Sequence, residues 1–182
     1  QTPTSTIKGI AKIRQDHKRN KGIQNQKISS KDPLLIETVG LIGEFAVAEY
    51  FSLINDEEIV PDLRLDPDPG WDLNIDGHQV DVKFSSYPDG DLIFTTLNHF
   101  SRNADRAILV VPYLDVSVAE HHPDYVPDRE PYIDIWVQQK YPIVKIAGWI
   151  DRETFLADSI NHSPDFDGRI CICLLYTSDA AD

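Results

Sequence analysis

The sequence predicts an α/β (α+β) protein with a central mixed β-sheet flanked by helices, and three observations support this prediction. The expected elements follow the order helix, strands, helix, strand, which is typical of helices packed against one sheet. Residues 106–114 contain an unbroken apolar run after Arg106, which favours a strand buried on both faces. A chain of 182 residues with 41% hydrophobic residues is also long enough for one compact domain with a sizeable core.

The first expected element is a basic segment at residues 1–31. It holds eight of the 17 Lys and Arg residues but only one of the 30 acidic residues, so the rest of the chain is strongly acidic. Two interpretations stay open: an arm that binds nucleic acid, or a solvated amphipathic helix over residues 6–21. In the second interpretation the inner face consists of Ile7, Ile10 and Ile13.

The sequence of residues 29–51 predicts a second helix. Asp32 is suited to the N-cap position and Pro33 to the first turn, and apolar residues follow at helical spacing. Because the segment is apolar nearly all round, we expect a central helix rather than a surface helix. A turn region rich in Pro and Asp, residues 61–71, leads from this helix to the next element.

The dipeptide Asp76-Gly77 lies between two runs of alternating apolar residues and predicts a β-hairpin with a two-residue turn. In the simplest register Leu73 pairs with Val80, and Asp72 stands opposite Asp81. A bulge near Gly70 or Asp72 would shift these pairs but would leave Asp81 and Lys83 on one face. The core face of this hairpin consists of Trp71, Leu73, Ile75, Val80, Val82 and Phe84. The opposite face carries Gly70, Asp72, Asn74, Gln79, Asp81 and Lys83.

The later elements alternate between apolar runs and polar segments. A short segment at 91–96 precedes a helix or turn at 97–105, and a loop covers 121–131. Besides the buried run, strands are expected at 132–138 and 143–150. Asp151 is suited to cap a last helix at residues 152–158.

The two aspartates of the hairpin suggest a cation site. Carboxylates directly opposite each other, about 4.5–5.5 Å apart at Cβ, repel unless another group compensates their charge. Mg²⁺ or Ca²⁺ would compensate it, since both ions take oxygen ligands. Lys83 shares this face with Asp81. The alternative is a solvated strand face in which Asp72, Asp81 and Lys83 make only a weak ion pair.

Glu44 is a further candidate because its helical neighbours are apolar or glycine. Burying a carboxylate there is costly unless it has a partner or a metal ion. Glu37 and Glu49 are competing candidates, more simply explained as surface or helix-end charges.

Together these motifs resemble the PD-(D/E)XK nucleases, the restriction-endonuclease-like family. That pattern places an acid on one strand and an acid, any residue and a lysine on the next, which Asp72 and Asp81-Val82-Lys83 match. The family often carries a glutamate on a preceding core helix, and GLIGEFAVAEYF places Glu44 at the matching position. The resemblance covers residues 33–114 well and the later strands only loosely.

The resemblance implies a metal-dependent endonuclease that hydrolyses phosphodiester bonds, with DNA favoured over RNA as the nucleic-acid partner. Asp72, Asp81 and the carbonyl of Val82 would hold Mg²⁺, or Mn²⁺ in its place, and Glu44 would bind the metal directly, through water or at a second site. Lys83 would position the water or stabilise negative charge. Phosphate contacts would come from the basic segment and the end of the second hairpin strand, through Lys8, Lys12, Arg14, Lys18, Arg19, Lys21 and Ser85.

Other histidines and acids favour structural interpretations. His78 falls on the core side of the hairpin and is expected to pack there, whereas His121 and His122 lack identifiable further metal ligands. Asp134 is most simply a surface acid. Two rival functions stay open: a catalytically silent nuclease-like fold that binds nucleic acid or protein, and a protein whose acidic hairpin binds Ca²⁺ structurally.

The remaining expectations concern boundaries and setting. Residues 1–31 are expected as a basic arm or helix, 32–172 as the nuclease-like domain, and 173–182 as a non-native tail, because CLLYTSDAAD resembles translated adapter sequence. The chain begins with Gln, so we expect a native start upstream.

Cys171 and Cys173 make neither a disulfide framework nor a zinc site. This use of cysteine favours a reducing, cytoplasmic setting, and without an apolar run of about 20 residues we expect no membrane partner. A homodimer is a candidate assembly, since restriction-like enzymes often act as dimers.

Overall fold

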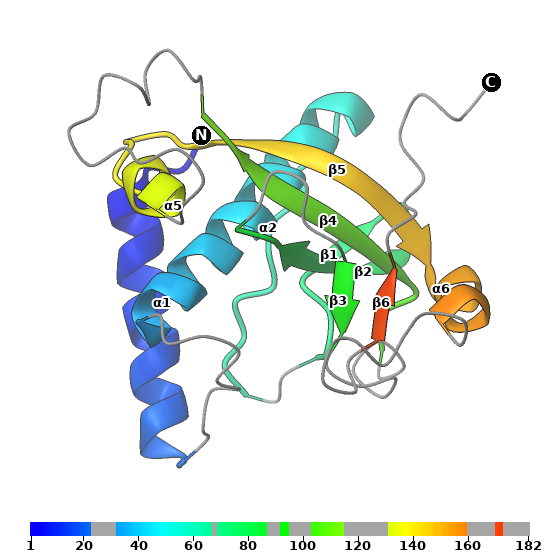
Figure 1. Ribbon diagram of the computed structural model, residues 1–182, viewed down its shortest axis with the longest axis horizontal. Helices are drawn as coiled ribbons and strands as arrows, with labels where there is room; N and C mark the ends of the chain where they lie inside the picture. The colour runs from blue at the N-terminus through cyan, green and yellow to red at the C-terminus, as the bar shows by residue number, and fades with distance from the viewer. Residues whose placement is uncertain are drawn as a thin grey trace.

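The computed structural model describes residues 1–22, 32–66, 69–86, 92–94, 103–114, 131–159 and 170–172. Within them a mixed four-stranded sheet has the strand order β1-β2-β4-β5 (Figure 1). Its strands are β1 (Leu73–Ile75), β2 (His78–Phe84), β4 (Arg106–Tyr113) and β5 (Ile143–Asp151). The β2–β4 pair is parallel, and the β1–β2 and β4–β5 pairs are antiparallel. A separate antiparallel pair consists of β3 (Leu92–Phe94) and β6 (Ile170–Ile172).

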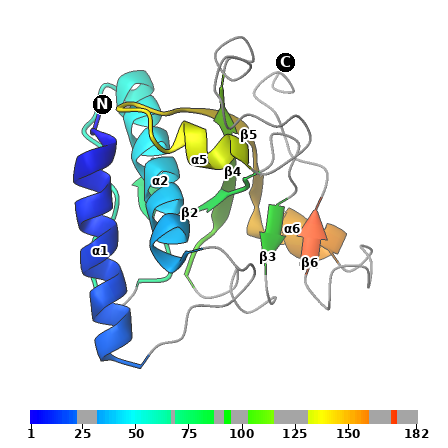
Figure 2. The same ribbon diagram turned by 60° about the vertical axis from the view of Figure 1, so that its left-hand side comes forward.

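The helices confirm the predicted layers of helix against a mixed sheet. They are α1 (Thr4–Asn20), α2 (Pro33–Asn55), α5 (Pro131–Trp136) and α6 (Arg152–Ser159). In two views α1 lies alongside α2, and α2 lies against the sheet (Figure 1, Figure 2). None of the helices in the described part of the chain combines the length and apolarity that crossing a bilayer would require.

Helix α2 begins as the sequence predicts. Pro33 occupies its first turn, and the Asp32 carboxylate accepts a hydrogen bond of 3.0 Å from the Leu34 amide. Its inner side packs Val47 and Ala48 on the sheet, in a cluster completed by Ile59, Leu73, Ile75, Val80, Val82, Ile108 and Val110. Most of the predicted core face of the hairpin therefore lies under α2.

Gly43 marks a close approach of α2 to the sheet. A Cβ atom placed on Gly43 would lie 2.8 Å from Cγ2 of Val110, closer than carbon atoms can pack, with Phe84 and Val82 next to it. No heavy atom of the described residues lies within 4 Å of the equivalent position on Gly40. The glycine at 43 thus lets the helix backbone reach the sheet and sets the depth of its neighbour Glu44.

The hairpin has the predicted turn, and its three ladder pairs have the predicted register. Asp76 and Gly77 have φ values of 50° and 81°, as a type I′ turn requires, and Leu73 pairs with Val80. Asn55, at the end of α2, donates a 2.9 Å hydrogen bond to the Asp76 carboxylate and ties the helix to this turn.

Strand β4 is buried on both faces, as its apolar run predicts. Ile108 and Val110 face α2, whereas Ala107, Leu109 and Val111 form a second cluster with Ile150 and with Phe155 of α6. Strand β5 and the last helix also form where expected, and Asp151 caps α6 through a 2.8 Å hydrogen bond from the Thr154 amide.

Four expectations about the fold are wrong, besides the pairing of Asp72 and the place of Glu37 described below. The segment 132–138 lies largely in helix α5 rather than in a strand, because Ile133, Trp136 and Val137 pack together at helical spacing against α1 and α2. Ile13 is 60% exposed, since Thr4, Ile7 and Ala11 form the buried face of α1.

The other two errors concern the hairpin. Trp71 is only half-buried, because the chain leaves the ladder before Leu73. His78 is 40% exposed and contacts Asp105 at 3.2 Å instead of packing in the core. The expectations for residues 97–102, for the loop up to residue 130 with His121 and His122, and for the tail 173–182 lie outside the described residues, whereas 103–105 form no helix.

Candidate functional site

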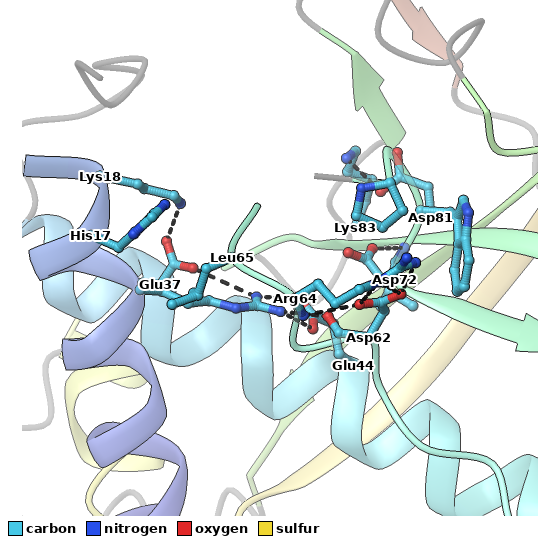
Figure 3. A pocket seen from close by; sticks show the side chains of 14 residues that line it. His17, Lys18, Glu37, Glu44, Asp62, Arg64, Leu65, Asp72, Asp81 and Lys83 are labelled. Atoms are coloured by element: carbon cyan, nitrogen blue, oxygen red, sulfur yellow. Dashed lines mark hydrogen bonds and ion pairs between the residues drawn. The ribbon is translucent and has the colours of Figure 1, made fainter. Parts of the chain in front are cut away.

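A cavity of about 360 Å³ lies where α1 and α2 meet the start of the hairpin. Figure 3 shows His17 and Lys18 of α1 at one end and Asp81 and Lys83 of β2 at the other, with Glu44 and Asp62 near the second group. The cavity is lined by Arg14, His17, Lys18, Glu37, Glu44, Asp62, Arg64, Leu65, Pro69, Trp71, Asp72, Asp81, Val82 and Lys83. It therefore brings together the four predicted catalytic side chains, which come from α2 and the hairpin.

The short length of β1 creates this site. The β1–β2 ladder ends at the pair Leu73–Val80, and the Asp72 amide donates to the Val80 carbonyl at 2.9 Å instead of continuing the ladder. The predicted face-to-face pairing of Asp72 with Asp81 is therefore wrong in register. Both carboxylates still reach the same cavity, because no strand of the described residues covers that edge of β2 beyond Val80.

The Asp72 carboxylate takes the place of the missing strand. Asp72 Oδ2 accepts a 2.7 Å hydrogen bond from the Val82 amide. The backbone carbonyl of Asp72 accepts a second hydrogen bond of 2.7 Å from the Asp62 amide. Burial raises the pKa of Asp72 well above its usual value, and repulsion from Glu44 and Asp81 raises it further, despite Lys83 and the Val82 amide. The surroundings of Asp72 therefore disfavour its ionised form relative to its protonated form.

Asp81 and Lys83 form the next contact along β2. Lys83 Nζ lies 2.7 Å from Asp81 Oδ1, and Asp81 is buried whereas the Lys83 side chain is 36% exposed. Burial lowers the pKa of Lys83, but Asp81, Asp72 and Glu44 outweigh that effect and leave the pKa raised. The ammonium group is therefore charged at neutral pH and lies among carboxylates, as predicted.

Glu44 enters the cavity from α2, next to Gly43. Burial raises its pKa, Arg14 opposes the shift, and repulsion from Glu37 and Asp81 adds to it. Arg14 Nη1 lies 3.3 Å from Glu44 Oε1. A carboxylate that would otherwise be costly to bury is thus held by a cation from α1, a partner that the sequence did not identify.

Glu37 also belongs to this cavity rather than to the surface or a helix end. Its side chain is 11% exposed and lies 3.6 Å from Arg14 and 2.5 Å from Lys18. Glu49, the other competing candidate, does not line the cavity. The sequence could have indicated Glu37, since residues 37, 40, 41 and 44 fall on one helical face.

The predicted nucleic-acid contacts divide into two groups. Arg14 and Lys18 lie in the cavity and pair with its acids, whereas Lys8, Lys12 and Arg19 are exposed elsewhere on α1. Lys21 pairs with Asp66. Ser85 follows β2, bonds through its amide to the Val110 carbonyl at 3.0 Å and does not line the cavity.

Further residues of the cavity were not predicted as site residues. Asp62 lies in the turn region, where its carboxylate accepts a 2.9 Å hydrogen bond from Arg64 Nε, and this bond lowers the Asp62 pKa. The Arg64 guanidinium lies 5.7 Å from the ring centre of Trp71. His17 lines the cavity from α1. Asp134, by contrast, is exposed on α5, as expected.

The oxygen donors around the cavity are of the kind that a hard divalent cation prefers. Glu44, Asp72 and Asp81 supply carboxylate oxygens around one cavity, and two of them carry pKa values raised by burial and repulsion that a cation would relieve. The Val82 carbonyl points to the same open edge as the Val82 amide, because both groups of a strand residue point to one side. In the described residues no three His, Cys, Asp or Glu side chains are already arranged to coordinate an ion, so these side chains would have to adjust.

Comparisons with known proteins do not identify the chain. No protein-family model matches it, and no curated protein or solved structure matches it significantly. The arrangement of the cavity is therefore the basis for a functional assignment.

Proposed function

We propose that this protein is a Mg²⁺-dependent nuclease of the PD-(D/E)XK type that hydrolyses phosphodiester bonds of DNA. The observation that carries the proposal is the convergence of Glu44, Asp72, Asp81 and Lys83 on one cavity at an open strand edge. Phosphodiester hydrolysis needs an activated water and a cation near the phosphoryl oxygens, and carboxylates beside a charged lysine suit both needs.

In this proposal the residues have distinct roles. Asp72 and Asp81, with the Val82 carbonyl, would hold Mg²⁺ or Mn²⁺, which when bound supplies Lewis-acid activation and neutralises phosphoryl charge. Lys83 would orient the attacking water or stabilise charge that develops on the phosphate, a role that suits a compact ammonium. Glu44 would assist at the metal once Arg14 moves from it.

The basic residues of α1 would supply the sequence-independent part of DNA binding. Lys8, Lys12 and Arg19 are exposed and available for phosphates, which would make the affinity fall with increasing salt. The strongly acidic composition of the rest of the chain favours docking through α1 rather than through the opposite face.

Cleavage assays test the proposal. Plasmid and single-stranded DNA are incubated with the wild-type protein in Mg²⁺, Mn²⁺ or EDTA, alongside Asp81→Asn and Lys83→Ala. We expect metal-dependent cleavage that both substitutions reduce by about 100-fold or more.

Matched controls replace the same residue types away from the cavity. Asp134→Asn and Lys145→Ala change an exposed acid on α5 and an exposed lysine on β5, and both should cleave at the wild-type rate. Cleavage that survives Asp81→Asn and Lys83→Ala would show that another site or a contaminant is responsible.

A catalytically silent nucleic-acid-binding module is the second candidate. The contact that favours it is the Arg14–Glu44 ion pair, because a guanidinium on Glu44 competes with a metal ion for that carboxylate. This candidate predicts DNA binding without cleavage under any metal condition, and binding that Lys83→Ala leaves almost unchanged.

A further inference from the structure

Trp71 gives the cavity a flat aromatic wall beside the acidic residues. It directly precedes Asp72 in the chain, is half-buried and lines the cavity together with Arg64. The Arg64 guanidinium lies 5.7 Å from the ring centre, and the Arg64 side chain is 56% exposed. A planar cation therefore occupies a position over the indole that a planar base can take once the exposed Arg64 side chain leaves its ion pair with Asp62.

The opposite side of the cavity offers a group suited to a phosphate. His17 Nε2 is buried and has no hydrogen-bond partner among the described residues, although the ring lines the cavity. A buried polar nitrogen without a partner is costly, and a phosphate oxygen could accept a hydrogen bond from it. Arg14 and Lys18 lie beside His17 on α1, but both pair with Glu37, so a phosphate at His17 would exchange contacts with that carboxylate.

The dimensions of the cavity favour a flexible strand. Its volume of about 360 Å³ is in the range of sites for small ligands and is comparable to one nucleotide. Glu44 is buried and Asp72 is half-buried on the side of the cavity formed by α2 and the hairpin, whereas the phosphates of a duplex lie on the surface of a stiff rod. An unpaired strand can bend and bring one phosphate to these carboxylates.

We propose that the cavity binds one unpaired nucleotide of single-stranded DNA, with its base stacked on Trp71. The strand crosses the cavity from α1 to the sheet, along the direction that joins His17 to Lys83 in Figure 3. The scissile phosphate lies at Lys83 and a flanking phosphate contacts His17. This inference rests on the proposed nuclease function and adds its substrate class: DNA that is single-stranded at the cleavage site.

Binding measurements test the inference without cleavage. All variants carry Asp81→Asn, and fluorescence anisotropy compares a short fluorescein-labelled single strand with a blunt duplex of the same sequence. We expect the single strand to bind about 10-fold more tightly than the duplex, and Trp71→Leu to remove about that factor, as loss of one stacked base does. Trp71→Phe should retain most of the affinity, because it keeps an aromatic face.

Trp149 offers a matched control. It is 39% exposed on β5 and also lies under an arginine, with Arg106 at 5.3 Å from its ring centre. Trp149→Leu should leave single-strand binding unchanged. Equal losses in Trp71→Leu and Trp149→Leu, or equal affinity for single strand and duplex, would overturn the inference. If Trp71→Leu fails to fold, quenching of the remaining tryptophan fluorescence by the single strand in Trp149→Phe decides the question, and unchanged fluorescence counts against stacking.

The two proposals fail in different ways. Single-strand binding that depends on Trp71, without metal-dependent cleavage by the protein with Asp81 intact, would retain the nucleotide site and reject the nuclease. Cleavage that depends on Asp81 but proceeds equally on single strand and duplex, and is unaffected by Trp71→Leu, would retain the nuclease and reject the nucleotide site.

Discussion

Two strand-end aspartates make the same type of hydrogen bond and have opposite electrostatic properties. Asp72 accepts the Val82 amide at 2.7 Å, and Asp151 accepts the Thr154 amide at 2.8 Å. The hydrogen bond from Thr154 lowers the pKa of Asp151, whereas burial raises the pKa of Asp72. The difference lies in the surroundings: Asp151 caps a helix at the edge of the sheet, and Asp72 shares a cavity with other acids.

The comparison separates a residue that stabilises the fold from one that costs stability. Asp151 is most favourable when charged, because the start of α6 offers it amide donors. Asp72 loses solvation and faces Glu44 and Asp81, so its charge is unfavourable until a cation joins it. Perturbed pKa values cluster at functional sites, which agrees with the role proposed for Asp72.

The largest expected effect is a difference in cleavage rate between Asp72→Asn and Asp151→Asn. Asp72→Asn should lower the rate of metal-dependent cleavage by about 100-fold or more, since it removes one of the proposed metal ligands. Asp151→Asn should cleave at the wild-type rate and change the free energy of unfolding by less than about 0.5 kcal/mol, because asparagine caps nearly as well. Plasmid nicking rates and urea unfolding give the two values. Similar cleavage by both variants would remove the distinction.

Replacing Gly43 tests whether the close approach of α2 to the sheet holds Glu44 near the other acids of the cavity. Gly43→Ala should lower the free energy of unfolding by about 2 kcal/mol and reduce cleavage, because the new Cβ overlaps Val110. Gly40→Ala, three residues earlier with open space at its Cβ, should raise stability by up to about 1 kcal/mol. Urea unfolding measures both, and a stabilising Gly43→Ala would contradict the close contact.

Replacing Arg14 tests whether its positive charge stabilises buried Glu44 when no metal ion is bound. Arg14→Gln should lower the free energy of unfolding by between about 1 and 2 kcal/mol, because buried Glu44 loses its cation. Added Mg²⁺ should then raise the melting temperature more in Arg14→Gln than in the wild type, since nothing competes for Glu44. Arg19→Gln, on the exposed side of α1, is the control and should match the wild type in both measurements.

The smallest effect is a dependence of stability on pH. A carboxyl group with a raised pKa in the folded state destabilises the fold once it ionises, so its cost is absent below about pH 4 and grows as pH rises through the raised pKa. Without metal, Asp72→Asn should therefore be more stable than the wild type by about 1 kcal/mol at neutral pH. The advantage should shrink as pH falls toward 4. Thermal melts in EDTA across this range measure it, and a constant difference would contradict the raised pKa.

Local signals predicted the parts of the fold that local geometry determines. The turn Asp76-Gly77 fixed the register of β1 with β2, and Asp32-Pro33 fixed the start of α2. The strand over residues 106–113 was recognisable because burial on both faces requires a continuous apolar run. Asp72, Asp81 and Lys83 were singled out by their spacing, which survives the change of register at Asp72, and Glu44 was singled out by its apolar helical neighbours.

Tertiary packing decided what the sequence alone could not. Ile133, Ile135 and Val137 alternate with polar or larger residues as in a strand, yet contact with α1 and α2 selects a helix. The orientation of α1 depends on small residues such as Thr4 and Ala11, so the inward direction of Arg14 could not be read from charge. The place of Trp71 followed from an irregular end of the ladder, which pattern rules do not locate.

The attachment of α2 at two points separates the origin of the acidic groups from that of the cations facing them. Gly43 seats the helix on β4, and Asn55 joins its far end to the hairpin turn, so two contacts set the position of Glu44 relative to the sheet. Helix α1 packs on α2 through Ile7 and Ala11, and Thr4 donates hydrogen bonds to the carbonyls of Gln139 and Lys140. Carboxylates of the α2–sheet unit are therefore balanced by Arg14 and Lys18 from a separately anchored helix, so a change in the seating of α1 would alter the charge of the cavity without displacing the strands.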